Sequence, residues 1–168
     1  MNEKNKAVFL DRDGTINVDR GYLFRIEDFE FLPGVLDALR LIQEKGFLIV
    51  IVTNQSGIGR GFYGEEDFKL LNDWMIGKLK EEGIRLAGVY YCPHLPDAKI
   101  EKYRCECDCR KPGTGLFYRA AKELDIDLTE SVVVGDKERD ITLAGEVKGC
   151  RGFLLGPDRS LLDVAKEL

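Results

Sequence analysis

Short runs of hydrophobic residues alternate along the chain with segments in which hydrophobic residues recur every three or four positions. Short apolar runs bounded by polar or turn residues are typical of buried strands. They cover residues 7–11, 47–53, 86–91, 132–135 and 152–155. The helical spacing occurs between them, at residues 35–42, 68–79, 116–124 and 161–165. Strands that alternate with helices in this way predict an α/β fold built on a parallel sheet.

The chain has 168 residues, too few for two ordinary domains, and it contains no repeat or Pro/Ser-rich linker. We therefore expect a single domain over residues 1–168. The longest apolar run, residues 47–52, is far shorter than a membrane-spanning helix, and the N-terminus lacks the apolar stretch of a secretory signal. These features predict a cytoplasmic protein without membrane association. No apolar helix face remains once the core helices are assigned, which favours a monomer.

Composition narrows the chemistry. Thirty acidic against 25 basic residues give a net charge of −5, which disfavours a nucleic-acid partner but allows a small basic pocket for a phosphorylated metabolite. A single histidine excludes zinc hydrolases that use a pair of them. No cysteine is followed by arginine at the spacing that cysteine phosphatases require. We therefore expect carboxylates to do the acid–base work.

Polar residues collect directly after the predicted strands. Asp11 and Asp13 follow the first strand, Thr53 ends the second, and Asp136 follows the fourth. In an open parallel sheet the carboxyl ends of the strands share one edge, where ligands bind. Each motif also has a simpler interpretation, such as a turn, a helix cap, a calcium loop or a solvated lysine in the case of Lys111. A calcium loop does not fit Asp11–Gly14, because its glycine comes later in the loop than Gly14 does here. A chain without a site at this edge would require all of these simpler interpretations to be true at the same time.

These residue types suit phosphoryl transfer. Asp11 would attack phosphorus, and Asp13 would exchange a proton with the leaving group and then with water. Mg²⁺ prefers oxygen ligands, which Asp11, the backbone carbonyl of Asp13 and Asp136 can provide. Thr53 and Lys111 would hold the phosphoryl oxygens. Asp140, four residues beyond Asp136, is placed to orient Lys111.

A polar loop at residues 92–109 concentrates soft metal ligands. Cys92, His94, Cys107 and Cys109 have the composition of a closed, structural zinc site. Disulfides are the alternative, and a reducing cytoplasm disfavours them. Cys105 also lies in the CECDC segment and can replace Cys107 or Cys109 in this ligand set. Bound zinc would fix the loop that leads directly into the Arg110–Lys111 pair.

Together, DRDGT, VTNQSG, a lysine ahead of a helix and GDxxxD resemble the haloacid dehalogenase superfamily of aspartyl-phosphate hydrolases. The resemblance runs from residue 7 to about residue 155. It implies a Rossmann-like parallel sheet with helices on both faces, Asp11 as nucleophile, Asp13 as acid/base and a catalytic Mg²⁺. The short spacings between the motifs leave no room for a large cap domain, so the chain resembles a capless member with a zinc-stapled loop.

Longer segments, DRDGTINVDRGY, TNQSGIGRG, YYCPHLP and CDCRKP, are similar to superfamily members that dephosphorylate a heptose bisphosphate. This resemblance implies a small phosphorylated sugar as substrate and a role for Arg110 in recognising its far end. It also implies a further Mg²⁺ ligand, the backbone carbonyl of Lys137. The positions that match substrate-lining residues are Asp19, Tyr22, Asn54, Gln55 and Ser56.

Three alternatives stay open. Histidinol-phosphate phosphatases share the CPHLP and CDCRKP elements, although the longer spacer from His94 to Cys107 and the NVDRGY segment favour the heptose substrate. A broader sugar-phosphate phosphatase is the second alternative. An inactive zinc module that binds protein partners is the third, and the intact carboxylate set counts against it. The anomer preference is not predicted.

Overall fold

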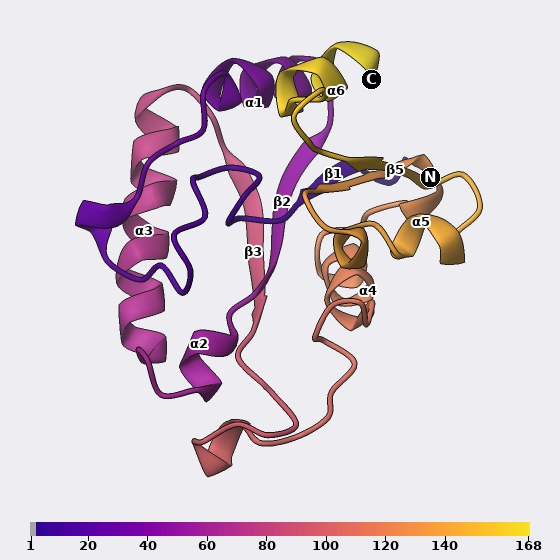
Figure 1. Ribbon diagram of the computed structural model, residues 1–168. Helices are drawn as coiled ribbons and strands as arrows, with labels where there is room; N and C mark the ends of the chain where they lie inside the picture. The colour runs from indigo at the N-terminus through magenta and orange to yellow at the C-terminus, as the bar shows by residue number, and fades with distance from the viewer. Residues whose placement is uncertain (1–2) are drawn as a thin grey trace.

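The computed structural model describes residues 3–168 and contains a five-stranded sheet (Figure 1). The strand order is β3-β2-β1-β4-β5, and every neighbouring pair is parallel. The bounds are β1 (Ala7–Leu10), β2 (Leu48–Asn54), β3 (Leu86–Cys92), β4 (Val132–Gly135) and β5 (Arg151–Leu154). Each lies within one residue of its predicted run, so the parallel α/β sheet is confirmed.

Four helices occupy the segments with helical spacing: α1 (Val35–Glu44), α3 (Glu65–Glu81), α4 (Gly115–Glu123) and α6 (Leu161–Glu167). The short helices α2 (Ser56–Gly59) and α5 (Leu143–Glu146) were not predicted. Neither were the 3₁₀ turns η1 (Ile26–Asp28), η2 (Glu101–Tyr103), η3 (Leu128–Glu130) and η4 (Glu138–Asp140). Segments of three or four residues are too short to show a period, so hydrophobic spacing does not reveal them.

Helices cover both faces of the sheet, as predicted. The α1, α3 and α6 helices pack on one face and α4 and α5 on the other (Figure 1). Alternation along β1 shows this division, since Val8 and Leu10 belong to the first hydrophobic cluster and Ala7 and Phe9 to the second. All four residues of β1 are buried because it is the central strand.

The chain changes direction across the sheet at β1. From β1 it continues to β2 on one side, and it later returns to β4 on the other side. Leu10 pairs with Ile51 of β2 and Val134 of β4, so the carboxyl ends of these three strands lie together. Such a switch point leaves a crevice outside the sheet edge, where ligands bind. The fold therefore brings together the polar segments that begin at Asp11, Thr53 and Asp136.

A long connection, residues 93–114, joins β3 to α4 and contains no regular element except η2 (Figure 1). It buries Leu95 and Ala98, and the amide of Cys105 donates to the carbonyl of Leu95.

Among residues 3–168, no helix combines the length and hydropathy needed to cross a bilayer.

Candidate active site

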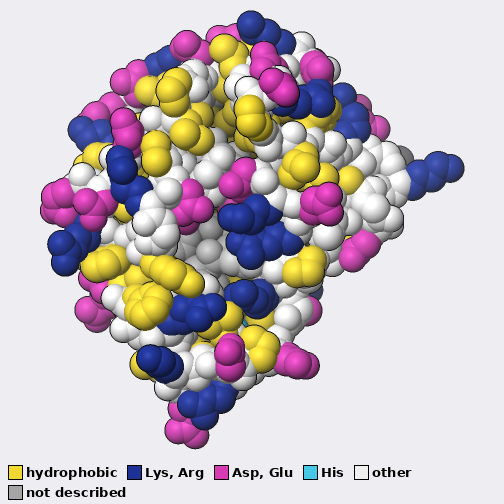
Figure 2. All heavy atoms as spheres, in the orientation of Figure 1, with side chains coloured by type: hydrophobic (Ala, Val, Ile, Leu, Met, Phe, Trp, Pro, Cys, Tyr) yellow, Lys and Arg dark blue, Asp and Glu magenta, His cyan; other side chains and the backbone are white. Residues whose placement is uncertain are grey.

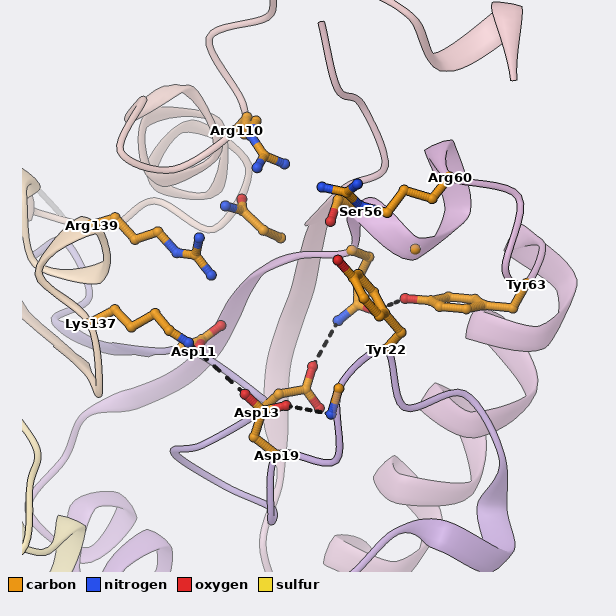
Figure 3. Close-up of a pocket in the computed structure, with 14 residues that line it drawn as sticks. Asp11, Asp13, Asp19, Tyr22, Ser56, Arg60, Tyr63, Arg110, Lys137 and Arg139 are labelled. Atoms are coloured by element: carbon orange, nitrogen blue, oxygen red, sulfur yellow. Dashed lines mark hydrogen bonds and ion pairs between the residues drawn. The ribbon is translucent and has the colours of Figure 1, made fainter. Parts of the chain in front are cut away.

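A cavity of about 340 Å³ opens at the carboxyl edge of the sheet (Figure 3). Nine residues predicted to bind substrate or metal, or to catalyse, line it: Asp11, Asp13, Asp19, Tyr22, Asn54, Gln55, Ser56, Arg110 and Lys137. Five lining residues were not predicted: Gly21, Gly57, Arg60, Tyr63 and Arg139. Thr53, Lys111 and Asp136 are not among the lining residues. The hydroxyl of buried Thr53 accepts a hydrogen bond from Gln55 (2.9 Å).

Lys111 is buried behind the cavity, and its ammonium group contacts three acceptors. Nζ lies 3.1 Å from Oδ1 of Asp11, 2.6 Å from Oδ1 of Asp140 and 2.7 Å from the carbonyl of Val52. Three acceptors match the three N–H donors of an ammonium group, so its position is determined. The contact with Asp140 is the one that the sequence spacing suggested.

The backbone of Lys111 is held separately, by the side chain of Asn54. The Asn54 amide donates to the Lys111 carbonyl (3.1 Å) and accepts from the Lys111 amide (2.9 Å). Asn54 ends β2, whereas Lys111 lies near the end of the long connection. This pair of hydrogen bonds therefore fastens the connection to the sheet. Asn54 also lines the cavity, so it has a structural role as well as contact with the cavity.

The environment of Asp11 makes its charged form less favourable than in water. Burial raises the pKa of Asp11 to about 6, an effect that the Lys111 ammonium opposes and that Asp140 strengthens. In the metal-free protein a proton therefore competes with any cation for this carboxylate at and below about pH 6.

Four donors fix the carboxylate of Asp13. Arg12 contacts both oxygens (3.0 Å from Nη2 to each), Asn17 donates to Oδ1 (2.9 Å) and Gln55 donates to Oδ2 (3.3 Å). Arg12 also donates from Nε to Oδ1 (3.1 Å), and its side chain is only 1% exposed. Tyr63 in turn donates to the amide oxygen of Gln55. Arg12 lies inside the DRDGT motif, but neither its burial nor the role of Tyr63 has a signal in the sequence.

Carboxylate oxygens of Asp11, Asp136 and Asp140 lie within 4.8 Å of one another. Oδ1 of Asp136 is buried without a hydrogen-bond partner, and burial raises the pKa of this carboxyl. A side chain at Gly14 would place its Cβ 2.3 Å from Oδ2 of Asp136, and Gly14 has φ +88°. An unpaired buried oxygen beside a second carboxylate fits a hard divalent cation such as Mg²⁺. Ligation by the backbone carbonyls of Asp13 and Lys137 stays a prediction.

The second ligand cluster lies in the long connection. The Sγ atoms of Cys92, Cys107 and Cys109 are 2.8–3.4 Å apart. Nδ1 of His94 lies 3.5 Å from Sγ of Cys92 and 3.4 Å from that of Cys109. Four soft donors gathered around one point fit a closed tetrahedral Zn²⁺ site. Cys105 is exposed and outside the cluster, so the geometry selects Cys107 and Cys109 from the alternatives.

The zinc-ligand cluster adjoins the cavity through Arg110. Nη1 of Arg110 lies 3.4 Å from the carbonyl of His94, and Lys111 follows in the chain. On the opposite wall the exposed ring of Tyr22 packs against Phe62 with its centroid 4.9 Å away. Lys137 Nζ lies 4.0 Å from a carboxylate oxygen of Asp19. The wall therefore combines the carboxylate of Asp19 with the cationic groups of Arg110 and Lys137 and the ring of Tyr22. This mixture suits a small polar ligand that carries negative charge.

Comparisons with known proteins agree with this arrangement. A family model described as HAD-hydrolase-like matches residues 108–159. The chain is 52% identical over 151 residues to the D-glycero-β-D-manno-heptose-1,7-bisphosphate 7-phosphatase of Haemophilus ducreyi, covering 89% of this chain and 82% of that protein. It is 50% identical over 138 residues to the protein of the same name from Escherichia coli K12, covering 82% and 72%.

A crystal structure of D,D-heptose 1,7-bisphosphate phosphatase from B. bronchiseptica, complexed with magnesium and phosphate, has a TM-score of 0.80 and 29% identity to this chain. The match covers 96% of this chain and 97% of that one. The chain therefore belongs to the haloacid-dehalogenase-like hydrolase superfamily, in the family of the D-glycero-β-D-manno-heptose-1,7-bisphosphate 7-phosphatases.

Proposed function

We propose that the protein is a Mg²⁺-dependent phosphatase that removes the 7-phosphate of D-glycero-β-D-manno-heptose 1,7-bisphosphate in the synthesis of nucleotide-activated heptose. The observation that carries this proposal is the cavity in which Asp11, backed by the buried Lys111 ammonium, lies with Asp13 in one wall. The family names support the substrate, because relatives at about half identity act on this heptose by name.

In the first step an oxygen of Asp11 attacks the phosphorus of the 7-phosphate. The Asp11–phosphorus bond forms as the bond from phosphorus to the sugar oxygen breaks, and Asp13 gives its proton to the leaving alkoxide. In the second step water attacks the phosphorus of the aspartyl phosphate and gives a proton to Asp13. Phosphate leaves with the water oxygen, and Asp11 is regenerated.

The remaining residues stabilise charge. Nζ of Lys111 lies 3.1 Å from Oδ1 of Asp11, so its positive charge is proposed to stabilise a phosphoryl group formed on Asp11. Thr53 is proposed to donate to the same group. Asp11 and Asp136 would hold Mg²⁺, together with the backbone carbonyls of Asp13 and Lys137. Bound Mg²⁺ neutralises part of the charge when a carboxylate meets a phosphate dianion.

The thiol and imidazole cluster is proposed to hold a structural Zn²⁺. Its four donors leave no open position for substrate, so its role is to fix the connection that carries Arg110 and Lys111. Thiolate ligands must stay reduced, a condition that a proposed cytoplasmic location would provide. A monomer that acts without nucleic acid or membrane remains our prediction.

Phosphate release in the presence of Mg²⁺ tests the proposal. The assay compares both anomers of heptose 1,7-bisphosphate with histidinol phosphate, and Asp11→Asn serves as the blank. We expect a preference for the bisphosphate of about 100-fold or more, equivalent to about 2.7 kcal/mol of transition-state discrimination. A preference for histidinol phosphate would leave the proposed mechanism in place and contradict the proposed substrate. No phosphate release from either compound would contradict the proposal that the protein is a phosphatase.

A further inference from the structure

Three guanidinium groups line the cavity without an acidic partner. Among residues 3–168, no ion pair within 4.0 Å involves Arg60, Arg110 or Arg139. The other cation of the wall, Lys137, lies 4.0 Å from Asp19. The carboxylates in the same wall pair with Lys111, Arg12 and Lys137 instead, so these three arginines are left for an anionic ligand. Figure 2 shows basic side chains gathered beside a hollow on the face it presents.

Two of these arginines carry a second signal. Nε of Arg60 and Nε of Arg139 are both buried and lack a hydrogen-bond partner within the described part of the chain. Buried donors in folded proteins are almost always paired, because an unpaired one loses its hydration without compensation. Both residues line the same cavity and neither guanidinium group pairs with a carboxylate, so the donors that face the cavity are left for the acceptors of a ligand.

The two residues approach from different parts of the fold. Arg60 directly follows α2, and Arg139 belongs to η4, next to Asp140. Figure 3 shows their guanidinium groups and that of Arg110 directed into the same space, away from Asp13. The ring of Tyr22 lies 5.6 Å from the guanidinium carbon of Arg60 and supports it by a cation–π contact.

We propose that Arg60 and Arg139 join Arg110 in a guanidinium clamp that binds the second, non-reacting phosphate of the substrate. This inference rests on the proposed function and deepens it, because it adds two residues that select a bisphosphate over a monophosphate. Planar forked donors with a permanent charge match the several oxygens of a phosphate dianion. Lys111 and the two catalytic aspartates are held by other partners, so the clamp acts on substrate position and affinity.

The test measures kcat/KM for two substrate pairs: heptose 1,7-bisphosphate with heptose 7-phosphate, and fructose 1,6-bisphosphate with fructose 6-phosphate. Within each pair only the second phosphate differs. The variants are Arg60→Gln, Arg139→Gln and Arg139→Lys. Arg119→Gln is the matched control, since Arg119 is exposed on α4 and pairs with Glu123 outside the cavity.

Each glutamine variant is expected to lower the bisphosphate-to-monophosphate ratio by about 10-fold or more, mainly through KM, because a charge-assisted contact is lost. Arg139→Lys should recover part of the ratio, and Arg119→Gln should leave it unchanged. Raised salt should weaken bisphosphate binding by the wild type more than by the glutamine variants. Partial rescue and a KM effect would separate binding from a purely structural role, and thermal unfolding of each variant checks the fold.

The outcomes separate this inference from the proposed function. A wild-type preference for heptose bisphosphate that both glutamine variants retain overturns the clamp alone. A preference only within the fructose pair, lost in the variants, supports the clamp and overturns the heptose substrate. No preference for the second phosphate in either pair overturns both.

Discussion

The two clusters of metal ligands in this protein are held in place in different ways. In the carboxylate cluster Asp11 directly follows β1 and Asp136 directly follows β4, two neighbouring strands whose residues are all buried. In the cysteine–histidine cluster only Cys92 belongs to a strand, and the other three ligands lie in the connection after β3. Folding of the sheet therefore assembles the first cluster, whereas we expect the second to depend on a bound metal. We expect the first metal to matter for turnover and the second for stability.

The largest expected effect comes from removing the nucleophile within the rigid cluster. Asp11→Asn should lower phosphate release by about 10³-fold or more, because the covalent step has no other group to perform it. The sheet should remain folded, which circular dichroism and thermal unfolding check. Asp97→Asn, an exposed position in the long connection, is the matched control and should retain activity. Substantial turnover by Asp11→Asn would remove Asp11 from the role of nucleophile.

Removing a zinc ligand should instead destabilise the protein. Cys109→Ser is expected to lower the free energy of unfolding by about 3 kcal/mol, or the Tm by about 6–12 °C for a chain of this size. Thermal unfolding, with zinc content measured by atomic absorption, gives the result. Cys105→Ser is the control and should keep both zinc and Tm, since Cys105 lies outside the cluster. Loss of zinc in the control, or an unchanged Tm in Cys109→Ser, would contradict the assignment.

A smaller effect is expected where the two regions join. Asn54→Ala removes both hydrogen bonds that fasten the backbone of Lys111 to the end of β2. We expect kcat to fall by about 10- to 30-fold, since each neutral hydrogen bond contributes about 1 kcal/mol. Steady-state kinetics measure this, with Asn72→Ala on α3 as the control. An effect on KM alone would mean that Asn54 contacts only substrate.

The smallest effect concerns pH. The folded pKa of Asp11, about 6, lies above its ordinary value of 3.8, so the metal-free folded protein holds an extra proton between about pH 4 and 6. Because that proton must leave before Mg²⁺ binds, Mg²⁺ affinity should fall about tenfold per pH unit below about pH 6 and level off above it. The same shift makes metal-free stability decrease as pH rises through this window. Calorimetric Mg²⁺ titrations at pH 5, 6, 7 and 8 should show this slope, and a flat profile would contradict it.

The sequence predicted the strands closely because each is a short buried run between polar or turn residues. Convergence of the segments that begin at Asp11, Thr53 and Asp136 could also be expected, since the switch-point rule requires only strand order and direction. The short helices α2 and α5 were not predicted, because a segment of four residues is too short to show a hydrophobic period. Four residues of the site were not predicted for another reason: Arg12, Tyr63, Arg60 and Arg139. Their roles depend on which side chains face one cavity from distant segments, and spacing along the chain does not encode that.

The cysteine segment shows the same limit on a smaller scale. Spacing alone allowed Cys105, Cys107 or Cys109 as ligands, because alternate residues in CECDC present equivalent thiols. In the structure Sγ of Cys107 and Cys109 lie 3.0 Å apart beside Cys92, while Cys105 is exposed. The path of the backbone therefore determines which of these cysteines join Cys92 in the ligand cluster.

The most direct measurement is phosphorus NMR of the reaction with D-glycero-β-D-manno-heptose 1,7-bisphosphate and Mg²⁺. The account predicts that the 7-phosphate signal is replaced by that of inorganic phosphate while the 1-phosphate signal persists, and that Asp11→Asn leaves both sugar phosphates intact. Loss of the 1-phosphate first, or a spectrum that does not change with the wild-type protein, would contradict it.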